Sequence, residues 1–412
     1  LRSWVNVAQG KPHGLPEAGE QSDPLFAFYS SDQRVYLDLA VGDYNKAKLG
    51  LRNMALVGGD HMRDLFLRAA PIMTKQGDAA FATALIGTAL GPDRIPVSGF
   101  PLGVKLAPET GLAALHTRIS SALLEQEISE PALVLARNAL WIEPTYEPAT
   151  IAVARALVAQ GQEATALALL ASIPATSPYW SPAVNERMAI LTAQKRFDDA
   201  LAAATEGASR WPKSLNMKIL VAQALAAKGD IQGAATQYRE VADLADKGGY
   251  GPRQRANYRL LLASTIDKAG NWAAAKQEME AALILDPNNA QILNYLGYNM
   301  LEKGDDPARA AAMIQRAYEM SPDSIAITDS MGWAHYKTGD IGKALPLLEK
   351  AAKAAGNDVA INEHLGDAYW RAGRRRDARY AWGVASEAAD DATAMRLATK
   401  VDIGLSDPYT TH

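Results

Sequence analysis

The chain contains 412 residues, with 42 Lys plus Arg against 46 Asp plus Glu, and no Cys. A net charge of −4 and a pI of about 5.9 argue against a nucleic-acid binder, which usually carries a basic face. The absence of Cys excludes disulfides, thiolate metal sites and a cysteine nucleophile, and no apolar run reaches the roughly 18 residues of a membrane span.

Residues 1–27 are expected to form an extended segment, because Pro, Gly and charged residues occur there without a helical period. The chain begins at Leu1 and not at Met. We therefore expect a fragment or a processed form, in which any signal or anchor segment would lie upstream of Leu1.

Residues 28–388 repeat with a period close to 34 residues. One alanine recurs in phase, with two longer steps of 50 and 41 residues, at Ala47, Ala82, Ala132, Ala166, Ala200, Ala234, Ala275, Ala310, Ala344 and Ala378. A glycine precedes it in eight repeats, at Gly42, Gly77, Gly161, Gly229, Gly270, Gly304, Gly339 and Gly373. Glycine can adopt a positive φ and end a helix, so each glycine predicts a turn between two helices.

The last three repeats add a second pattern. Gly297, Gly332 and Gly366 lie 35 and 34 residues apart, each after a large apolar residue. Two antiparallel helices approach closely only where side chains are small, so these glycines are expected to face the repeated alanine, as Gly297 would face Ala310. The whole pattern resembles the tetratricopeptide repeat, a helix–turn–helix unit. The resemblance implies an all-α fold, a right-handed α-solenoid of about ten repeats.

The two longer steps mark insertions near residues 91–109 and 243–253. The first is rich in Pro and Gly and predicts a loop, whereas the second is expected to lengthen a second helix before a glycine turn. Residues 389–412 are interpreted as a capping helix and tail, with Ala394, Leu397 and Val401 on the packed side of the helix.

Catalytic motifs are not recognisable. The sequence contains no G-x-S-x-G elbow, P-loop or dinucleotide-binding glycine pattern, and none of its six histidines forms a metal-ligand pair. His335 and His364 occupy successive repeats, and we favour two packed or solvated histidines over a shared metal. We therefore predict a non-enzymatic protein without cofactor or metal.

The first helix of each repeat lines the concave surface in solenoids of this kind, which suggests a partner-binding groove. Aromatic residues carry much of the energy of interfaces, and neighbouring acids could receive a basic or polar segment. The groove positions of the C-terminal repeats are Asn294, Tyr298, Asp329, Trp333, Tyr336, Glu363, Asp367, Trp370 and Arg371. The alternative is that Trp333 and Trp370 fill contacts between repeats and expose little.

Five arginines cluster between Arg371 and Arg379. They are interpreted either as a docking patch for an acidic partner or an anionic lipid surface, or as an exposed loop balanced by Asp377 and Glu387; we favour the balanced loop at this stage.

The succession of C-terminal repeats, including Leu293–Tyr298 and His364–Trp370, also resembles the long tetratricopeptide proteins of proteobacteria. Several of these are lipoproteins of the periplasm and outer membrane, and some are adaptors of carboxyl-terminal processing proteases. The resemblance implies a scaffold that binds protein or peptide partners in its groove, with a periplasmic location favoured over a cytoplasmic one. The alternatives are a structural subunit of an envelope complex, docking through its convex face, termini or loops, and the regulatory part of an enzyme. No nucleic-acid partner is expected, and membrane association would be indirect, through a lipid anchor upstream of Leu1.

Overall fold

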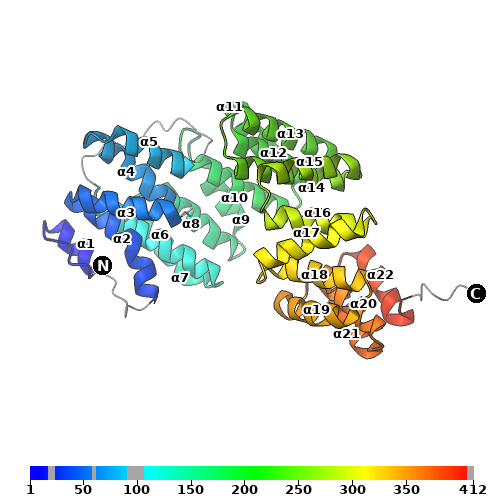
Figure 1. The fold of residues 1–412 in the computed structure, drawn as a ribbon. Coiled ribbons are helices and arrows are strands. Elements are labelled where there is room, and N and C mark those ends of the chain that lie inside the picture. Colours follow the sequence, from blue (N-terminus) through cyan, green and yellow to red (C-terminus); the bar gives the residue numbers. More distant parts are fainter. Residues whose placement is uncertain (17–23, 58–61, 91–105, 406–412) are drawn as a thin grey trace, which may run out of the picture. The chain divides into compact units, whose positions relative to one another are not determined.

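The fold was analysed in a computed structural model that describes residues 1–16, 24–57, 62–90 and 106–405 (Figure 1). Within these ranges the protein is all-α, with 22 helices, about 80% helical content and no strand. None of the described helices combines the length and the apolar character that crossing a bilayer requires. The chain divides into two compact units, unit 1 (Leu1–Tyr250) and unit 2 (Gly251–His412), and the boundary falls inside the second predicted insertion.

Both units are stacks of antiparallel helix pairs. Unit 1 begins with the single helix α1 (Arg2–Ala8). Six pairs of consecutive helices follow, formed by α2 (Pro24–Val41) and α3 (Tyr44–Val57), α4 (Arg63–Lys75) and α5 (Ala79–Leu90), α6 (Pro108–Glu125) and α7 (Ser129–Ile142), α8 (Glu147–Val158) and α9 (Glu163–Ala171), α10 (Trp180–Ala193) and α11 (Phe197–Arg210), and α12 (Leu215–Lys228) and α13 (Ile231–Lys247). Unit 2 contains four pairs and a last helix, which are α14 (Pro252–Lys268), α15 (Trp272–Leu285), α16 (Ala290–Glu302), α17 (Pro307–Met320), α18 (Ile325–Lys337), α19 (Ile341–Ala355), α20 (Val359–Arg371), α21 (Arg375–Ala388) and α22 (Asp391–Ile403).

The repeated alanine holds each pair together. All ten predicted alanines lie on second helices, from α3 to α21, and each is at most 2% exposed. A methyl group at this position lets the two backbones approach, and any larger side chain would have to push them apart. The predicted all-α fold of about ten tetratricopeptide helix pairs is confirmed.

The glycines on the first helices of unit 2 allow the same close approach. A Cβ atom on Gly297 would lie 2.9 Å from the carbonyl oxygen of Ala310, as the sequence pattern predicts. One on Gly366 would lie 2.3 Å from the indole nitrogen of Trp382, which is fully buried. Substituting these glycines would therefore force a large second-helix side chain out of its place.

The turns within the pairs use left-handed backbone. All eight predicted turn glycines have positive φ, between 69° and 92°. Two repeats lack the glycine and carry Glu127 and Lys195 instead, and these residues also adopt positive φ, at 62° and 57°. The packing of the helix pair therefore imposes the left-handed backbone at the turn, even where the residue has a Cβ atom that disfavours a positive φ.

The N-terminal prediction is wrong in part. The segment expected to be extended to residue 27 contains the helix α1, and α2 already begins at Pro24. Trp4, 4% exposed, anchors α1: its indole donates to Gln33 at 2.9 Å and its ring lies where a Cβ on Gly111 would stand. A packed tryptophan thus stabilises a helix too short to be stable alone, which a search for helical period does not detect.

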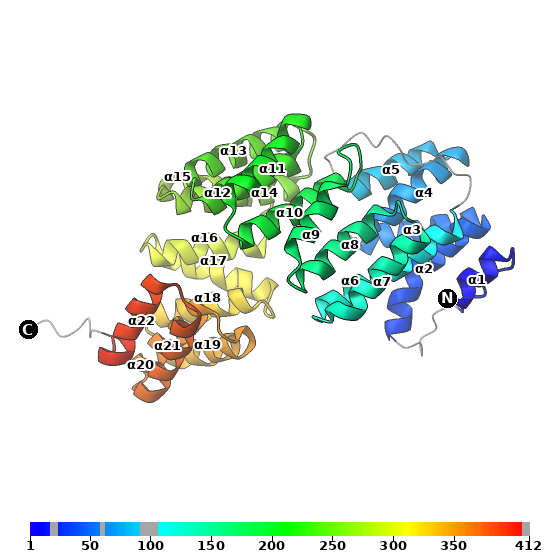
Figure 2. The ribbon, with the colours of Figure 1, turned by 180° about the vertical axis from the view of Figure 1, so that it is seen from behind.

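The remaining predictions on the ends and insertions have mixed outcomes. Residues 91–105 of the first insertion lie outside the described residues, and α6 begins at Pro108. The second insertion lengthens α13 to 17 residues before a glycine turn, as predicted. The capping helix α22 packs on α21 at the end of unit 2 (Figure 2), with Leu397 fully buried and Asp390 accepting a hydrogen bond as N-cap.

Candidate functional site

The predicted partner-binding residues lie on three neighbouring first helices of unit 2. The helix α18 lies between α16 and α20, and the residues follow a helical period of three to four along each helix. We call the surface formed by Tyr298, Trp333, Tyr336, Trp370 and Arg371, with the polar residues bonded to them, the first-helix face.

Trp333 is the centre of an aromatic stack. Its ring lies 4.0 Å from that of His364 at 17° and 4.6 Å from that of Tyr336 at 10°, measured between centroids. Its indole nitrogen donates to Glu302 at 2.6 Å, and the ammonium of Lys337 stands 5.3 Å above the ring. Because Trp333 is only 6% exposed, it fills a contact between repeats, as the alternative sequence interpretation held.

His364 joins the three first helices. Its Nδ1 lies 2.9 Å from the carboxylate of Asp329, and its Nε2 lies 3.3 Å from the hydroxyl of Tyr298. Burial raises the pKa of the Tyr298 hydroxyl, and nearby acids add to this effect. A protonated hydroxyl can donate to Nε2, which leaves the Nδ1–H group to donate to Asp329. This chain of bonds fixes the relative positions of α16, α18 and α20.

Acidic residues of α20 bind the capping helix. Glu363 accepts hydrogen bonds from Arg396 at 2.7 Å and Lys400 at 2.6 Å. Burial alone would raise the pKa of Glu363, but these bonds outweigh it and hold the pKa at about 2. Asp367 accepts from Lys400 at 2.8 Å and from the indole of Trp382 at 2.9 Å, and its burial raises its pKa despite Lys400.

The exposed edge of the first-helix face is aromatic and cationic. Tyr336 and Trp370 are half-buried and Arg371 is exposed, with its guanidinium 5.7 Å from the Tyr336 ring. Trp370 packs against the ring of Trp382 at 5.4 Å and under the guanidinium of Arg375 at 3.8 Å. Their role as partner contacts stays a prediction, and it now concerns this edge more than the buried Trp333.

The other predicted residues contribute polar groups. Asn294 is half-buried, and its side-chain oxygen has no hydrogen-bond partner among the described residues. His335 is half-buried near the end of α18, and within the described ranges no group of three His, Cys, Asp or Glu side chains is placed to hold a metal. The contact between His364 and Asp329 was not predicted, although the two residues lie about one repeat length apart.

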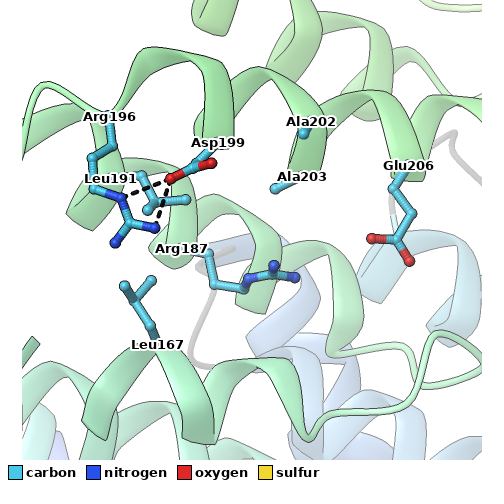
Figure 3. A pocket seen from close by; sticks show the side chains of 8 residues that line it. All are labelled: Leu167, Arg187, Leu191, Arg196, Asp199, Ala202, Ala203 and Glu206. Carbon is cyan, nitrogen blue, oxygen red and sulfur yellow. Dashed lines mark hydrogen bonds and ion pairs between the residues drawn. The ribbon is translucent and has the colours of Figure 1, made fainter. Parts of the chain in front are cut away.

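Unit 1 contains an open pocket of about 350 Å³ between α9, α10 and α11 (Figure 3). Its walls combine four apolar and four charged side chains, with an ion pair between Arg196 and Asp199 at one side. Arg187 and Glu206 also line it, and neither has an ion-pair partner in the described structure. Since these two groups carry opposite charges, the pocket favours no ligand of one sign, and we assign it no function.

A buried polar cluster in unit 1 was also missed by the sequence analysis. The carboxylate of Asp64 on α4 accepts hydrogen bonds from three tyrosine hydroxyls and from Arg68 at 2.9 Å. The tyrosines come from distant segments and are Tyr36, Tyr146 and Tyr179. Burial alone would raise the pKa of Asp64, but Arg68 and the tyrosines hold it below its ordinary value. The cluster is closed to solvent and joins α2 and α4 to the starts of α8 and α10.

Comparisons with known proteins agree with this geometry. Residues 191–249, 260–325 and 330–393 match the family described as tetratricopeptide repeat. The matched part of the chain contains tetratricopeptide repeats. It is 33% identical over 86 residues to the TPR repeat-containing protein PA4667 of Pseudomonas aeruginosa, a match that spans 21% of this chain and only 14% of that relative.

Two solved structures are also similar to this chain, at low sequence identity. A repeat protein from Parabacteroides merdae covers 70% of this chain and 98% of its own at 11% identity, with a TM-score of 0.45. A chain of the APC/C hetero-tetramer Cut9–Hcn1 covers 90% of this chain and 89% of its own at 14% identity, with a TM-score of 0.43. Tetratricopeptide-repeat proteins generally mediate protein–protein interactions and are typically non-enzymatic.

Proposed function

We propose that the chain is a non-enzymatic scaffold that binds a partner protein through the first-helix face of unit 2. The observation that carries this proposal is the exposed edge formed by Tyr336, Trp370 and Arg371. The ring of Tyr336 packs on the buried stack of Trp333 and His364. Tyr, Trp and Arg are the residues that most often dominate binding energy at interfaces. Side chains that are already held in place by packing also lose little conformational entropy when a partner binds.

The finer proposal is an adaptor in the bacterial envelope that delivers bound proteins to a processing protease. It rests on the resemblance of the C-terminal repeats to envelope members of the family. Its test is fractionation of the native host with an antibody against this chain, together with co-purification of a protease. Recovery of the chain only in the cytosolic fraction would contradict the envelope location while leaving the scaffold proposal intact.

The scaffold proposal is tested by partner capture. The tagged chain and its Tyr336→Ala/Arg371→Ala variant are used to capture proteins from a native-host extract, and the recovered proteins are identified by mass spectrometry. Both replaced side chains lie at the exposed edge, so helical content should stay unchanged. We expect the variant to lose most of at least one partner. Equal recovery by both proteins would contradict binding through the first-helix face.

A second candidate function is assembly through the second helices of unit 1. Trp141 on α7 is 85% exposed, and Val134 lies exposed seven residues earlier on the same side of the helix. An exposed tryptophan beside a second apolar side chain is typical of interaction surfaces. Trp141→Ser in the same capture experiment separates the two functions: loss of partners with this variant alone favours assembly through α7.

A further inference from the structure

The turn between α20 and α21 concentrates positive charge in a chain that is negative overall. Arg371–Arg379 contains five arginines and one aspartate, for a net charge of +4. The equivalent stretches of the four preceding repeats, residues 227–235, 268–276, 303–311 and 337–345, carry between 0 and +2. We call Arg371, Arg375, Arg376 and Arg379 the arginine edge.

The cations of the arginine edge lack acidic partners in the part of the chain that the structure describes. Arg374 is neutralised by Glu349 at 2.9 Å and Asp377 at 2.7 Å. The four arginines of the edge form no ion pair with any described residue. The guanidinium of Arg379 donates to the carbonyl of Val401 at 2.7 Å, and Arg376 is exposed. Within the described residues neighbouring acids therefore balance Arg374 alone, so the interpretation favoured from the sequence, a loop balanced by Asp377 and Glu387, holds for one of the five arginines.

Most comparable cations in earlier repeats of unit 2 are paired, although Lys268, at the position of Arg371, forms no ion pair within the described residues. Lys276 binds Asp305 at 2.7 Å, Lys337 lies 3.3 Å from Glu302, and Lys343 lies 3.0 Å from Asp340. The second helices α15, α17 and α19 also begin with Asn or Asp side chains that accept a backbone hydrogen bond, whereas Arg374 stands at this position before α21. The last repeat thus departs from the rest of its unit in the amount of positive charge and in the share of cations that are paired.

Aromatic rings hold two of these guanidinium groups in place. Arg375 lies 3.8 Å from the centroid of the Trp370 ring, and Arg379 lies 5.4 Å from the same ring. A guanidinium that rests on a ring keeps its N–H groups available at the rim, where they can bind a carboxylate through two hydrogen bonds. Through Trp370 and Arg371 the edge is continuous with the first-helix face.

The acids of the first-helix face, unlike the arginines of the arginine edge, are paired. Glu302, Asp329, Glu363 and Asp367 are all bonded to cations or donors of unit 2 itself. A basic partner segment would have to displace these internal contacts, while an acidic segment would find unpaired arginines. The sequence alone suggested a basic or polar partner segment, whereas these contacts favour an acidic one.

We infer that the partner segment is an acidic peptide, whose carboxylates bind the arginine edge while its neighbouring residues contact Tyr336 and Trp370. This inference rests on the proposed function and specifies the chemistry of the partner. Protein carboxylates are favoured over a lipid surface because the edge adjoins the aromatic residues of the first-helix face. Electrostatic complementarity of this kind guides association and excludes basic competitors.

The inference is tested by fluorescence anisotropy with a fluorescein-labelled peptide that alternates Glu with Leu and Tyr. A peptide with Lys in place of Glu is the comparison. We expect the full chain to prefer the acidic peptide by on the order of tenfold, with an affinity that falls as salt is added. The Arg371→Glu/Arg376→Glu variant should lose this preference, again by on the order of tenfold.

Two controls separate binding from general effects. Arg210→Glu/Arg253→Glu makes the same charge change at exposed arginines that lack an ion-pair partner in the described ranges and lie outside the edge, and should bind the peptide normally. Arg371→Gln/Arg376→Gln, which removes charge without reversing it, should show an intermediate loss and guards against misfolding of the charge-reversed variant.

Several results would overturn the inference. These are equal binding of the acidic and basic peptides, unchanged binding by Arg371→Glu/Arg376→Glu, and binding to phosphatidylglycerol vesicles through the same arginines without binding of the peptide. The capture experiment with Tyr336→Ala as the only substitution tells the two proposals apart. If Tyr336→Ala loses partners and the arginine variant does not, the scaffold function stands and the acidic-peptide inference falls.

Discussion

Lys195 occupies a turn position where eight other repeats have glycine, and we predict that Lys195→Gly stabilises unit 1. The left-handed conformation costs a residue with a Cβ roughly 1–2 kcal/mol. Glycine removes that cost but adds about 0.4–1 kcal/mol of entropy to the unfolded chain. The Lys195 side chain is exposed and forms no hydrogen bond or ion pair with a described residue, so its removal costs nothing further. The net gain in unfolding free energy is about 0.5–1 kcal/mol.

The reciprocal change is Gly161→Ala, in the same unit and the same kind of turn. A Cβ at Gly161 would meet no atom within 4 Å, so the effect of the methyl group is confined to the backbone with φ at 71°. We expect a loss of about 0.5–1 kcal/mol, from the same two opposing contributions.

Urea unfolding followed by circular dichroism measures both changes. Glu127→Gly, at the other turn without glycine, should repeat the result of Lys195→Gly, because its φ is 62°. A lower unfolding midpoint for Lys195→Gly, or an unchanged one for Gly161→Ala, would refute the argument that the backbone at these turns is under strain.

Three further predictions concern charged groups. Asp64→Asn should lower the unfolding free energy by about 3 kcal/mol in urea titrations, because it removes the closer of two carboxylates beside the buried Arg68 guanidinium and leaves Glu143 at 3.7 Å. The folded-state pKa of Glu363, about 2, lies below its ordinary value of 4.5, so its stabilising contribution is complete above the unfolded value and is lost as pH falls from about 4.5 to about 2. Thermal melts across that range should therefore depend less on pH in Glu363→Gln. Arg187→Ala should change the unfolding free energy by less than about 0.5 kcal/mol, because the side chain has no ion-pair partner in the described structure. A larger loss in urea unfolding would show that it forms a pair in solution.

The candidate site was predictable in position but not in chemistry. The repeat period placed Tyr298, Trp333 and Trp370 on successive first helices, and the structure confirms those helices. The repeat period could not show that Trp333 would be covered by His364 and Tyr336, because stacking depends on rotamers and on the spacing of neighbouring helices. Nor could it show that Arg396 and Lys400 would neutralise the acids of α20 from the capping helix.

The sequence by itself determined the helix pairs, their turns and their order, because each of these depends on residues within one repeat or between neighbouring repeats. The repeated alanine and the positive-φ glycine are local requirements and can be seen in the chain. Tertiary structure alone decided which charges remain free and which are buried. Asp64 meets Tyr179 across 115 residues, a distance in sequence where no periodic pattern applies, and Glu363 meets Lys400 in the capping helix, outside the repeats. Such contacts arise only when several helices pack together, and they determine which charges of unit 2 are neutralised inside the fold.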